Sequence, residues 1–425
     1  MTNIKGSNKS GIGNGAYLLI FLSWVVYSAS YLGKVNYSAN ITQIVDYYQI
    51  SKAEAGIVPS FFFFAYSVGQ VVNGIFCKKY NIKWMVFFSL FTSAIINLIV
   101  ALTPDFNIIK WLWMLNGFML SILWPTLVRL LSGALPQKDL GKSSVVMGTT
   151  VAAGTLVIYG LSSVFAMFDM FKLSFYTAAF TDMIVAVLWI VFYKKAFNSA
   201  YEEKFKEAII HNDEPNKEKF IENSGAGNKI FYITISVLCL YAVIVNLTKD
   251  GLTTWVPSIL KENFAMSDSL SILLTLTLPI VAIFGNISAL KMHKRIPDYI
   301  MHCFLVFVVI GGIIGLIIAG ISLTQIAFTL VGLIVVNLMA SSLNSLITSI
   351  FPIFMREKVN SGLFAGVLNS FCYVGSTISS YGLGLVADNF GWISVFWLLI
   401  GCCIFACVVW LIYVCIKYFL CVCEV

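Results

Sequence analysis

Twelve apolar stretches follow one another along the chain, separated for the most part by short polar turns. A helix needs about 20 apolar residues to cross the hydrocarbon core of a bilayer, and each stretch is long enough to do so. The composition agrees, because 59% of the 425 residues are hydrophobic and 11% are charged. Soluble domains carry about 25% charged residues. We therefore predict an all-α membrane protein with twelve transmembrane helices.

One long polar segment divides the twelve stretches into six and six. It lies between Tyr193 and Lys229 and is rich in charged residues. We predict two six-helix bundles joined by a linker that acts as a tether. The expected boundaries are a tail (1–15), a first bundle (16–193), a linker (194–228), a second bundle (229–417) and a tail (418–425). The first apolar stretch lacks a small-residue cleavage site, so we expect a true span and not a signal peptide.

Basic residues predict how the chain is oriented. If both termini and the linker share one side, that side collects 20 of the 27 Lys and Arg residues. The opposite loops contain Lys52, Lys110, Lys172 and Lys261. Because cytoplasmic loops carry an excess of Lys and Arg, we predict cytoplasmic termini and a multi-pass protein of the plasma membrane. This orientation explains the net charge of +7 without nucleic-acid binding, and we expect a monomer in the lipid bilayer.

The sequence offers little support for enzymatic chemistry. Its ten cysteines lie mostly inside apolar stretches, without paired CxxC motifs at zinc spacing. Small, buried, reduced cysteines are the expected state. We find no nucleotide-binding loop and no nucleophile–base pair, and we predict no enzyme, no metal and no cofactor.

Two lysines lie deep in matching spans of the two halves. Lys34 follows the start of the first span at Ala16 by 18 residues, and Lys249 follows the start of the seventh span at Ile230 by 19. A lysine inside a bilayer is costly, which favours a functional role. Matching positions in two halves are typical of transporters built from repeats. The pair predicts a binding site for a small anionic substrate between the halves.

Polar residues in the first span recur at helical spacing. Tyr27, Tyr31, Lys34 and Ser38 follow one another at steps of three and four residues, which places them on one face of a helix. That face could line a cavity, or it could pack against a neighbouring helix with its hydroxyls bonded to backbone carbonyls.

Two carboxylates lie within the predicted spans and leave alternatives open. Asp250 is next to Lys249 and could pair with it, although adjacent helical residues point about 100° apart. Asp182 lies in the middle of the apolar segment TAAFTDMIVAV. It could couple transport to protons, or it could be hydrogen-bonded to a neighbouring helix without a role in coupling.

Several motifs carry a family resemblance along nearly the whole chain. They are Tyr27-x-x-x-Tyr31-x-x-Lys34-x-Asn36-Tyr37, Trp124-Pro125 with Arg129, Lys249-Asp250-Gly251-Leu252 followed by Trp255-Val256-Pro257, and GLVADNFGW at 384–392. With these motifs the chain resembles the major facilitator superfamily, and within it the organophosphate:phosphate antiporter family of glycerol-3-phosphate and hexose-phosphate carriers. The resemblance implies that Lys34 and Lys249 hold the substrate phosphate, at positions where the family usually has arginine.

Two further departures from the family pattern concern residues of the expected binding site. Thr150 stands where the family usually has histidine, and Gln70, four residues after Tyr66, stands where it often has lysine. The complete set of predicted substrate-binding residues is Lys34, Lys249, Tyr27, Tyr31, Tyr66, Gln70, Trp124, Thr150, Asn246, Asn369 and Tyr373. Asp182 is the candidate for proton coupling.

The sequence thus predicts a secondary active transporter of a small organic anion. The expected cargo is an organophosphate, such as a sugar phosphate or glycerol phosphate, exchanged for inorganic phosphate by alternating access. Two alternatives stay open. The lysines and Asp182 are also compatible with a proton-coupled symporter of organic acids. The resemblance also covers transporter-like membrane sensors of a phosphorylated metabolite.

Overall fold

The computed structural model describes residues 14–76, 80–211, 227–354 and 361–422. Residues 1–13, 212–226 and 423–425, which belong to the predicted tails and linker, lie outside the described part. The first half contains α1 (Asn14–Ala39), α2 (Ile41–Tyr48), α3 (Lys52–Phe76), α4 (Ile82–Leu102), α5 (Phe106–Leu120), α6 (Leu123–Ala134), α7 (Gln137–Gly148), α8 (Thr150–Ala166) and α9 (Lys172–His211). The second half contains α10 (Gly227–Phe264), α11 (Asp268–Thr275), α12 (Thr277–Ala282), α13 (Gly285–Arg295), α14 (Tyr299–Ser322), α15 (Ile326–Ser345), η2 (Leu346–Ile350), α16 (Phe351–Phe354) and α17 (Ser361–Val422).

These helices form the twelve predicted spans. Ten helical segments of the described chain are long and apolar enough to cross a bilayer, and α11–α13 together form a further span with a 46° bend. The 62-residue α17 contains the last two spans, because its helix is interrupted at Gly391. That residue has φ 75° and ψ 171°, a backbone conformation that glycine adopts at little cost. The prediction of an all-α membrane protein with two six-helix bundles is confirmed.

One helix extends beyond the expected boundary of the first bundle. Instead of ending near residue 193, α9 continues to His211. Its extra turns pack on the first span, where Ala196 and Ala200 are fully buried. Glu203 accepts hydrogen bonds from the backbone N–H groups of Gly15 and Ala16, each 3.1 Å long. A carboxylate at this place satisfies free donors at the start of α1, which explains the continuation.

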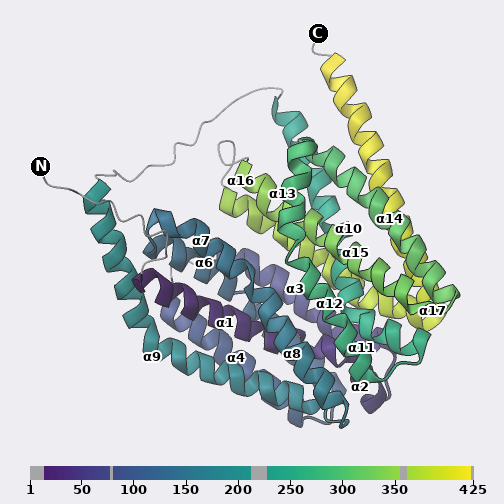
Figure 1. Cartoon of the computed structure of the whole chain (residues 1–425), viewed down its shortest axis with the longest axis horizontal. Coiled ribbons are helices and arrows are strands. Elements are labelled where there is room, and N and C mark those ends of the chain that lie inside the picture. The colour runs from purple at the N-terminus through teal and green to yellow at the C-terminus, as the bar shows by residue number, and fades with distance from the viewer. Residues whose placement is uncertain (1–13, 77–79, 212–226, 355–360, 423–425) are drawn as a thin grey trace, which may run out of the picture.

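The two halves lie side by side and are not parallel (Figure 1). We call the face where α9 ends and α10 begins the linker face, and the other face the opposite face. In Figure 1 the halves converge toward α2 and α11 and diverge toward α6, α7, α13 and α16. The backbones of the two halves therefore lie farther apart at the linker face than at the opposite face.

Helices α3 and α17 form a continuous seam between the halves. Ser60 Oγ donates to the carbonyl of Thr377 over 2.7 Å, and Ser67 Oγ donates to the carbonyl of Ser370 over 3.1 Å. Further toward the linker face, Asn369 Nδ2 donates to Gln70 Oε1. Small residues allow such close helix approach, because their side chains leave the backbones free to meet.

Charged residues join the halves at the opposite face. Asp388 accepts hydrogen bonds from the backbone N–H groups of Lys52 (3.2 Å) and Ala53 (2.7 Å), at the start of α3. An acidic side chain is favourable at a helix N-terminus because of the helix dipole. On another helix pair, Lys261 Nζ lies 2.7 Å from Asp46 and 2.9 Å from Asp268. These contacts close the opposite face.

Candidate functional site

A cavity of about 570 Å³ lies between the two halves. Its walls come from α1, α3 and α6–α8 in the first half and from α10, α12, α15, η2 and α17 in the second. The lining side chains with polar or aromatic groups are Tyr27, Tyr31, Gln70, Trp124, Asn246, Lys249, Asp250, Ser341, Asn344, Ser345, Thr348, Ser349, Asn369, Cys372 and Tyr373. A cavity of this size and mixed lining is typical of a small-molecule site.

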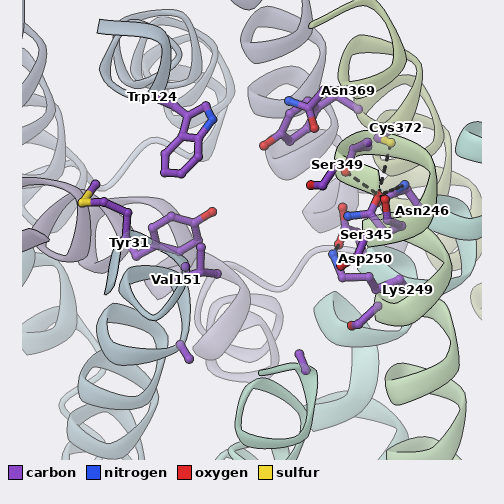
Figure 2. A pocket seen from close by; sticks show the side chains of 18 of the residues that line it. Tyr31, Trp124, Val151, Asn246, Lys249, Asp250, Ser345, Ser349, Asn369 and Cys372 are labelled. Atoms are coloured by element: carbon purple, nitrogen blue, oxygen red, sulfur yellow. Dashed lines mark hydrogen bonds and ion pairs between the residues drawn. The ribbon is translucent and has the colours of Figure 1, made fainter. Parts of the chain in front are cut away.

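The two walls of the cavity differ in chemistry. Figure 2 shows Tyr31 and Trp124 on one side and Lys249 and Asp250 on the other. On the first-half wall the ring of Tyr27 lies 4.9 Å from that of Trp124 and 5.5 Å from that of Tyr31, between centroids. This wall presents mainly aromatic faces, with the amide of Gln70, whereas the second-half wall presents mainly charges, amides and hydroxyls, with the ring of Tyr373.

Hydrogen bonds fix the polar wall. Asn246 Nδ2 donates to Asn344 Oδ1 over 3.0 Å, and Cys372 Sγ donates to the same oxygen over 3.3 Å. These three side chains come from α10, α15 and α17, so the contacts hold three spans of the second half in register. The wall is thus preorganised before a ligand binds.

Lys249 is held by its neighbour in the chain. Its Nζ lies 3.0 Å from Asp250 Oδ1, and both side chains are about one-fifth exposed. Asp250 Oδ2 also accepts a hydrogen bond of 2.5 Å from Ser376 Oγ. The structure thus shows the ion pair that the sequence left open for this lysine.

Lys34 has a different environment, which we call the aromatic cage. Its Nζ lies 4.4 Å from the ring centroid of Tyr66, 4.9 Å from Tyr31 and 5.2 Å from Tyr373. The rings of Phe62 and Phe63 complete the cage at 5.7 and 6.0 Å. Ring faces attract cations, but they do not neutralise the charge.

The ammonium of Lys34 forms no ion pair and no hydrogen bond with another residue of the described part of the chain. It interacts electrostatically with Lys249 and Asp250. Lys34 itself is not part of the cavity lining, but Tyr31 and Tyr373 of its cage are. An unpaired cation therefore lies one layer of rings from the cavity.

Most of the predicted binding residues meet at this cavity. Those that line it are Tyr27, Tyr31, Gln70, Trp124, Asn246, Lys249, Asn369 and Tyr373. Tyr66 lies behind them, with its ring centroid 4.6 Å from that of Tyr373. Thr150 differs from the prediction: it is fully buried inside the first bundle, and its hydroxyl donates to the carbonyl of Met147. Its helix turns the neighbouring residues Val151 and Ala152 toward the cavity instead.

Asp182 is also placed away from the cavity. It is fully buried inside the first bundle, where its Oδ2 accepts a 2.8 Å hydrogen bond from Ser93 Oγ. A Cβ built on Gly33 would lie 2.7 Å from this oxygen, so α1 approaches α9 closely at this level. Asn97 bonds to Asn36 over 2.8 Å in the same buried group. This geometry favours the second alternative for Asp182, a hydrogen-bonded carboxyl that holds spans together.

We therefore expect Asp182→Asn to leave transport intact. The amide has the size of the carboxyl group, and its oxygen can still accept the bond from Ser93. Substrate accumulation and its pH dependence should match those of the parent at equal expression. Loss of concentrative uptake with unchanged substrate binding would instead assign proton coupling to Asp182.

Sequence reasoning left several lining residues out of the predicted set. On α15 and η2 these are Ser341, Asn344, Ser345, Thr348 and Ser349. Their steps of three and four residues place them on one face of a helix, the same signal that we used for the first span. Asp250 was considered only as a partner of Lys249, although it lines the cavity itself.

Comparisons with known proteins agree with this architecture. A family model described as the Major Facilitator Superfamily matches residues 23–361. The chain is 21% identical to a probable hexose phosphate transport protein of Chlamydia trachomatis, over 92% of this chain and 89% of that protein. It is 23% identical to the glycerol-3-phosphate transporter of Bacillus subtilis, over 92% of this chain and 90% of that protein.

A solved structure shows the same fold. It is a bacterial homolog of the human lysosomal transporter Spinster, in an inward-facing and occupied conformation. The TM-score is 0.72 at 12% identity, with 95% of this chain and 97% of that chain covered. Because the family model spans most of the chain and the twelve helices form two six-helix bundles, the protein belongs to the Major Facilitator Superfamily and is a transporter and not an enzyme.

Proposed function

We propose that the chain exchanges a small organophosphate, such as a sugar phosphate or glycerol phosphate, for inorganic phosphate across the plasma membrane. The observation that carries this proposal is Lys34, a cation without an anionic partner among the described residues, beside a cavity that both halves line. The relatives named as a hexose phosphate transport protein and a glycerol-3-phosphate transporter support the choice of phosphate esters.

The walls of the cavity suit such a ligand. A phosphate oxygen accepts charge-assisted hydrogen bonds from lysine, and these are stronger than bonds between neutral groups. The amides and hydroxyls of the polar wall, including Asn246 and Ser349, can bond to the hydroxyl groups of a sugar or glycerol. Trp124 and Tyr31 offer ring faces to its C–H groups.

The arrangement of the halves supports alternating access. The cavity lies at the boundary of two bundles that are joined along the α3–α17 seam and at the opposite face. Rocking of one bundle against the other would part this seam and close the linker face. In this mechanism the structure is the state in which the cavity opens toward the linker face.

A binding panel tests the choice of ligand. Lysine lacks the bidentate fork of arginine and also binds carboxylates, so a carboxylate symporter is the competing function. Purified protein in detergent should be stabilised against heat by inorganic phosphate, glycerol 3-phosphate and glucose 6-phosphate, and not by glucose. Stabilisation by carboxylates alone would overturn the phosphate assignment and favour the symporter.

The orientation is tested by cysteine labelling. We propose that the linker face is cytoplasmic, since most basic residues lie there. A cysteine at the exposed Ser267, in the loop before α11, should react with an impermeant maleimide on intact cells. A cysteine at the exposed Glu202, near the end of α9, should react only after permeabilisation. The parent protein controls for its ten native cysteines. The reverse pattern would contradict the proposed orientation.

A further inference from the structure

The strongest unexplained feature of the site is the carboxylate of Asp250. Among the described residues that line the cavity it is the acidic one, and it faces the proposed anion site. A carboxylate at such a place repels an anionic ligand. Binding of phosphate by two lysines alone therefore does not explain why a carboxylate is present at the site.

We propose that Asp250 is a resident counter-ion that sets the charge of the ligand, so that the site favours a singly charged anion over a doubly charged one. The inference rests on the proposed function, because it concerns the same site and the same ligand class. Lys34 and Lys249 contribute two positive charges and Asp250 one negative charge, which leaves one net positive charge for the ligand.

The geometry keeps the pair of Lys249 and Asp250 together. One oxygen of Asp250 lies 3.0 Å from Lys249 Nζ, and the other accepts a bond from Ser376, whose side chain is fully buried on α17. Asp250 is thus held from two sides. A ligand that drew Lys249 away would leave this partly buried carboxylate without its cation, which is strongly unfavourable. The unpaired Lys34, one layer of rings from the cavity, is therefore the cation whose charge is left for a ligand.

Other charged and titratable groups do not alter this balance. Those that interact electrostatically with Asp250, besides Lys249, are Lys34 and Tyr31 of α1 and Cys372 and Tyr373 of α17. Two other helices that pack on α10 carry carboxylates. Asp46 of α2 and Asp268 of α11 both form ion pairs with Lys261 at the opposite face. The first turns of α14 contain the titratable residues Tyr299, His302 and Cys303. The rings of Tyr299 and His302 both stack with the ring of His293. The lining residues of α15 are neutral.

The charge of a phosphate ester depends on pH, whereas that of a sulfate ester does not. The second ionisation of a phosphate monoester has a pKa of about 6, so the ester is mainly singly charged at pH 5 and doubly charged at pH 8. A single negative charge would neutralise the site. A second one would remain uncompensated between the protein walls, where charges interact more strongly than in bulk solvent.

The test compares glucose 6-phosphate with glucose 6-sulfate, using titration calorimetry on the purified full-length chain. Between pH 5 and pH 8 the affinity for the phosphate should fall roughly ten- to hundredfold, following the fraction of the singly charged ester. The affinity for the sulfate should change far less. A change in the sulfate affinity of the same size would mean that the protein titrates and not the ligand, and would overturn the inference.

Two variants test the role of Asp250 directly. Asp250→Asn keeps an oxygen acceptor for Ser376 and removes the charge, so the site gains a second net positive charge. At pH 8 it should bind glucose 6-phosphate at least tenfold more tightly than the parent. The double variant Lys249→Ala with Asp250→Asn has one net positive charge again, and should regain the parent's preference for the singly charged ester.

The outcomes separate this inference from the proposed function. If the parent binds glucose 6-phosphate, and Asp250→Asn shows the same pH profile, Asp250 does not set the ligand charge and only this inference fails. If the parent binds neither the phosphate ester nor inorganic phosphate at any pH, the proposed function fails and the inference falls with it.

Discussion

Replacement of Lys34 by alanine should weaken the binding of a phosphate ester about ten- to hundredfold. A charge-assisted hydrogen bond contributes about 1.5–3 kcal/mol, and each 1.4 kcal/mol corresponds to a factor of ten in affinity. Lys34 is the cation that no carboxylate of the described chain neutralises, so its loss removes the net positive charge of the site. Removing a buried charge relieves a cost to insertion, so the variant should still fold in the membrane.

Lys34→Met is the control for packing. Methionine keeps an unbranched chain of similar length within the cage of Tyr31, Tyr66 and Tyr373, but it carries no charge. It should therefore bind as weakly as the alanine variant. Lys34→Arg keeps the charge and should be far milder. Calorimetry at matched protein quality measures all three. If Lys34→Met binds every tested anion as tightly as the parent, the lysine is structural.

Lys249→Ala should weaken binding by a similar factor, for a different reason. It leaves Asp250 without its cation, so the remaining carboxylate opposes Lys34 and repels the ligand. Removal of Asp250 as well should restore part of the affinity, whereas removal of Lys34 as well should not.

Gly56→Val should reduce exchange about ten- to hundredfold while ligand binding persists. Gly56 lies in the α3–α17 seam, and a Cβ at this residue would collide with the backbone carbonyl of Ser380. Overpacking of this kind costs about 1–3 kcal/mol, and here the cost applies to the state in which the opposite face is closed. The variant should populate the state in which the seam is open. Exchange in reconstituted vesicles and binding in detergent measure the two effects separately.

Gly382→Val is the matched control. Gly382 lies on α17, and a Cβ built on it meets no atom within 4 Å. The same change at this site should leave exchange near the parent rate. Should Gly56→Val also exchange at the parent rate, closure of the seam is not part of the transport cycle, and the proposed alternating access fails.

Several features of the fold and the site follow from local sequence alone and were predictable. Span number and fold class depend on apolar length, and the matched depths of Lys34 and Lys249 can be counted along the chain. The extension of α9 could not be predicted in this way, because it depends on Glu203 meeting the start of α1, 188 residues earlier. Contacts between distant segments carry no local signal.

The site shows the same limit. Lys249 and Asp250 are adjacent, yet their pairing is supported by Ser376, which lies on another helix. The cage of Lys34 takes one of its rings from Tyr373 of the other half. Thr150 was expected at the site because of the family resemblance, and Asp182 was left open between proton coupling and a structural role, but helix rotation places both inside the first bundle. Such rotation is hard to infer for helices that are apolar on nearly all sides.

Exchange in proteoliposomes distinguishes a phosphate antiporter from a sensor and from a symporter. Vesicles that contain the purified protein and labelled inorganic phosphate are diluted into buffer with or without external glycerol 3-phosphate or glucose 6-phosphate, and the release of label is followed. We predict release that depends on an external phosphate compound and that is strongly reduced in Lys34→Met. Binding of the same compounds without release would contradict the proposed antiport and indicate a sensor, and uptake driven only by a pH gradient would indicate a symporter.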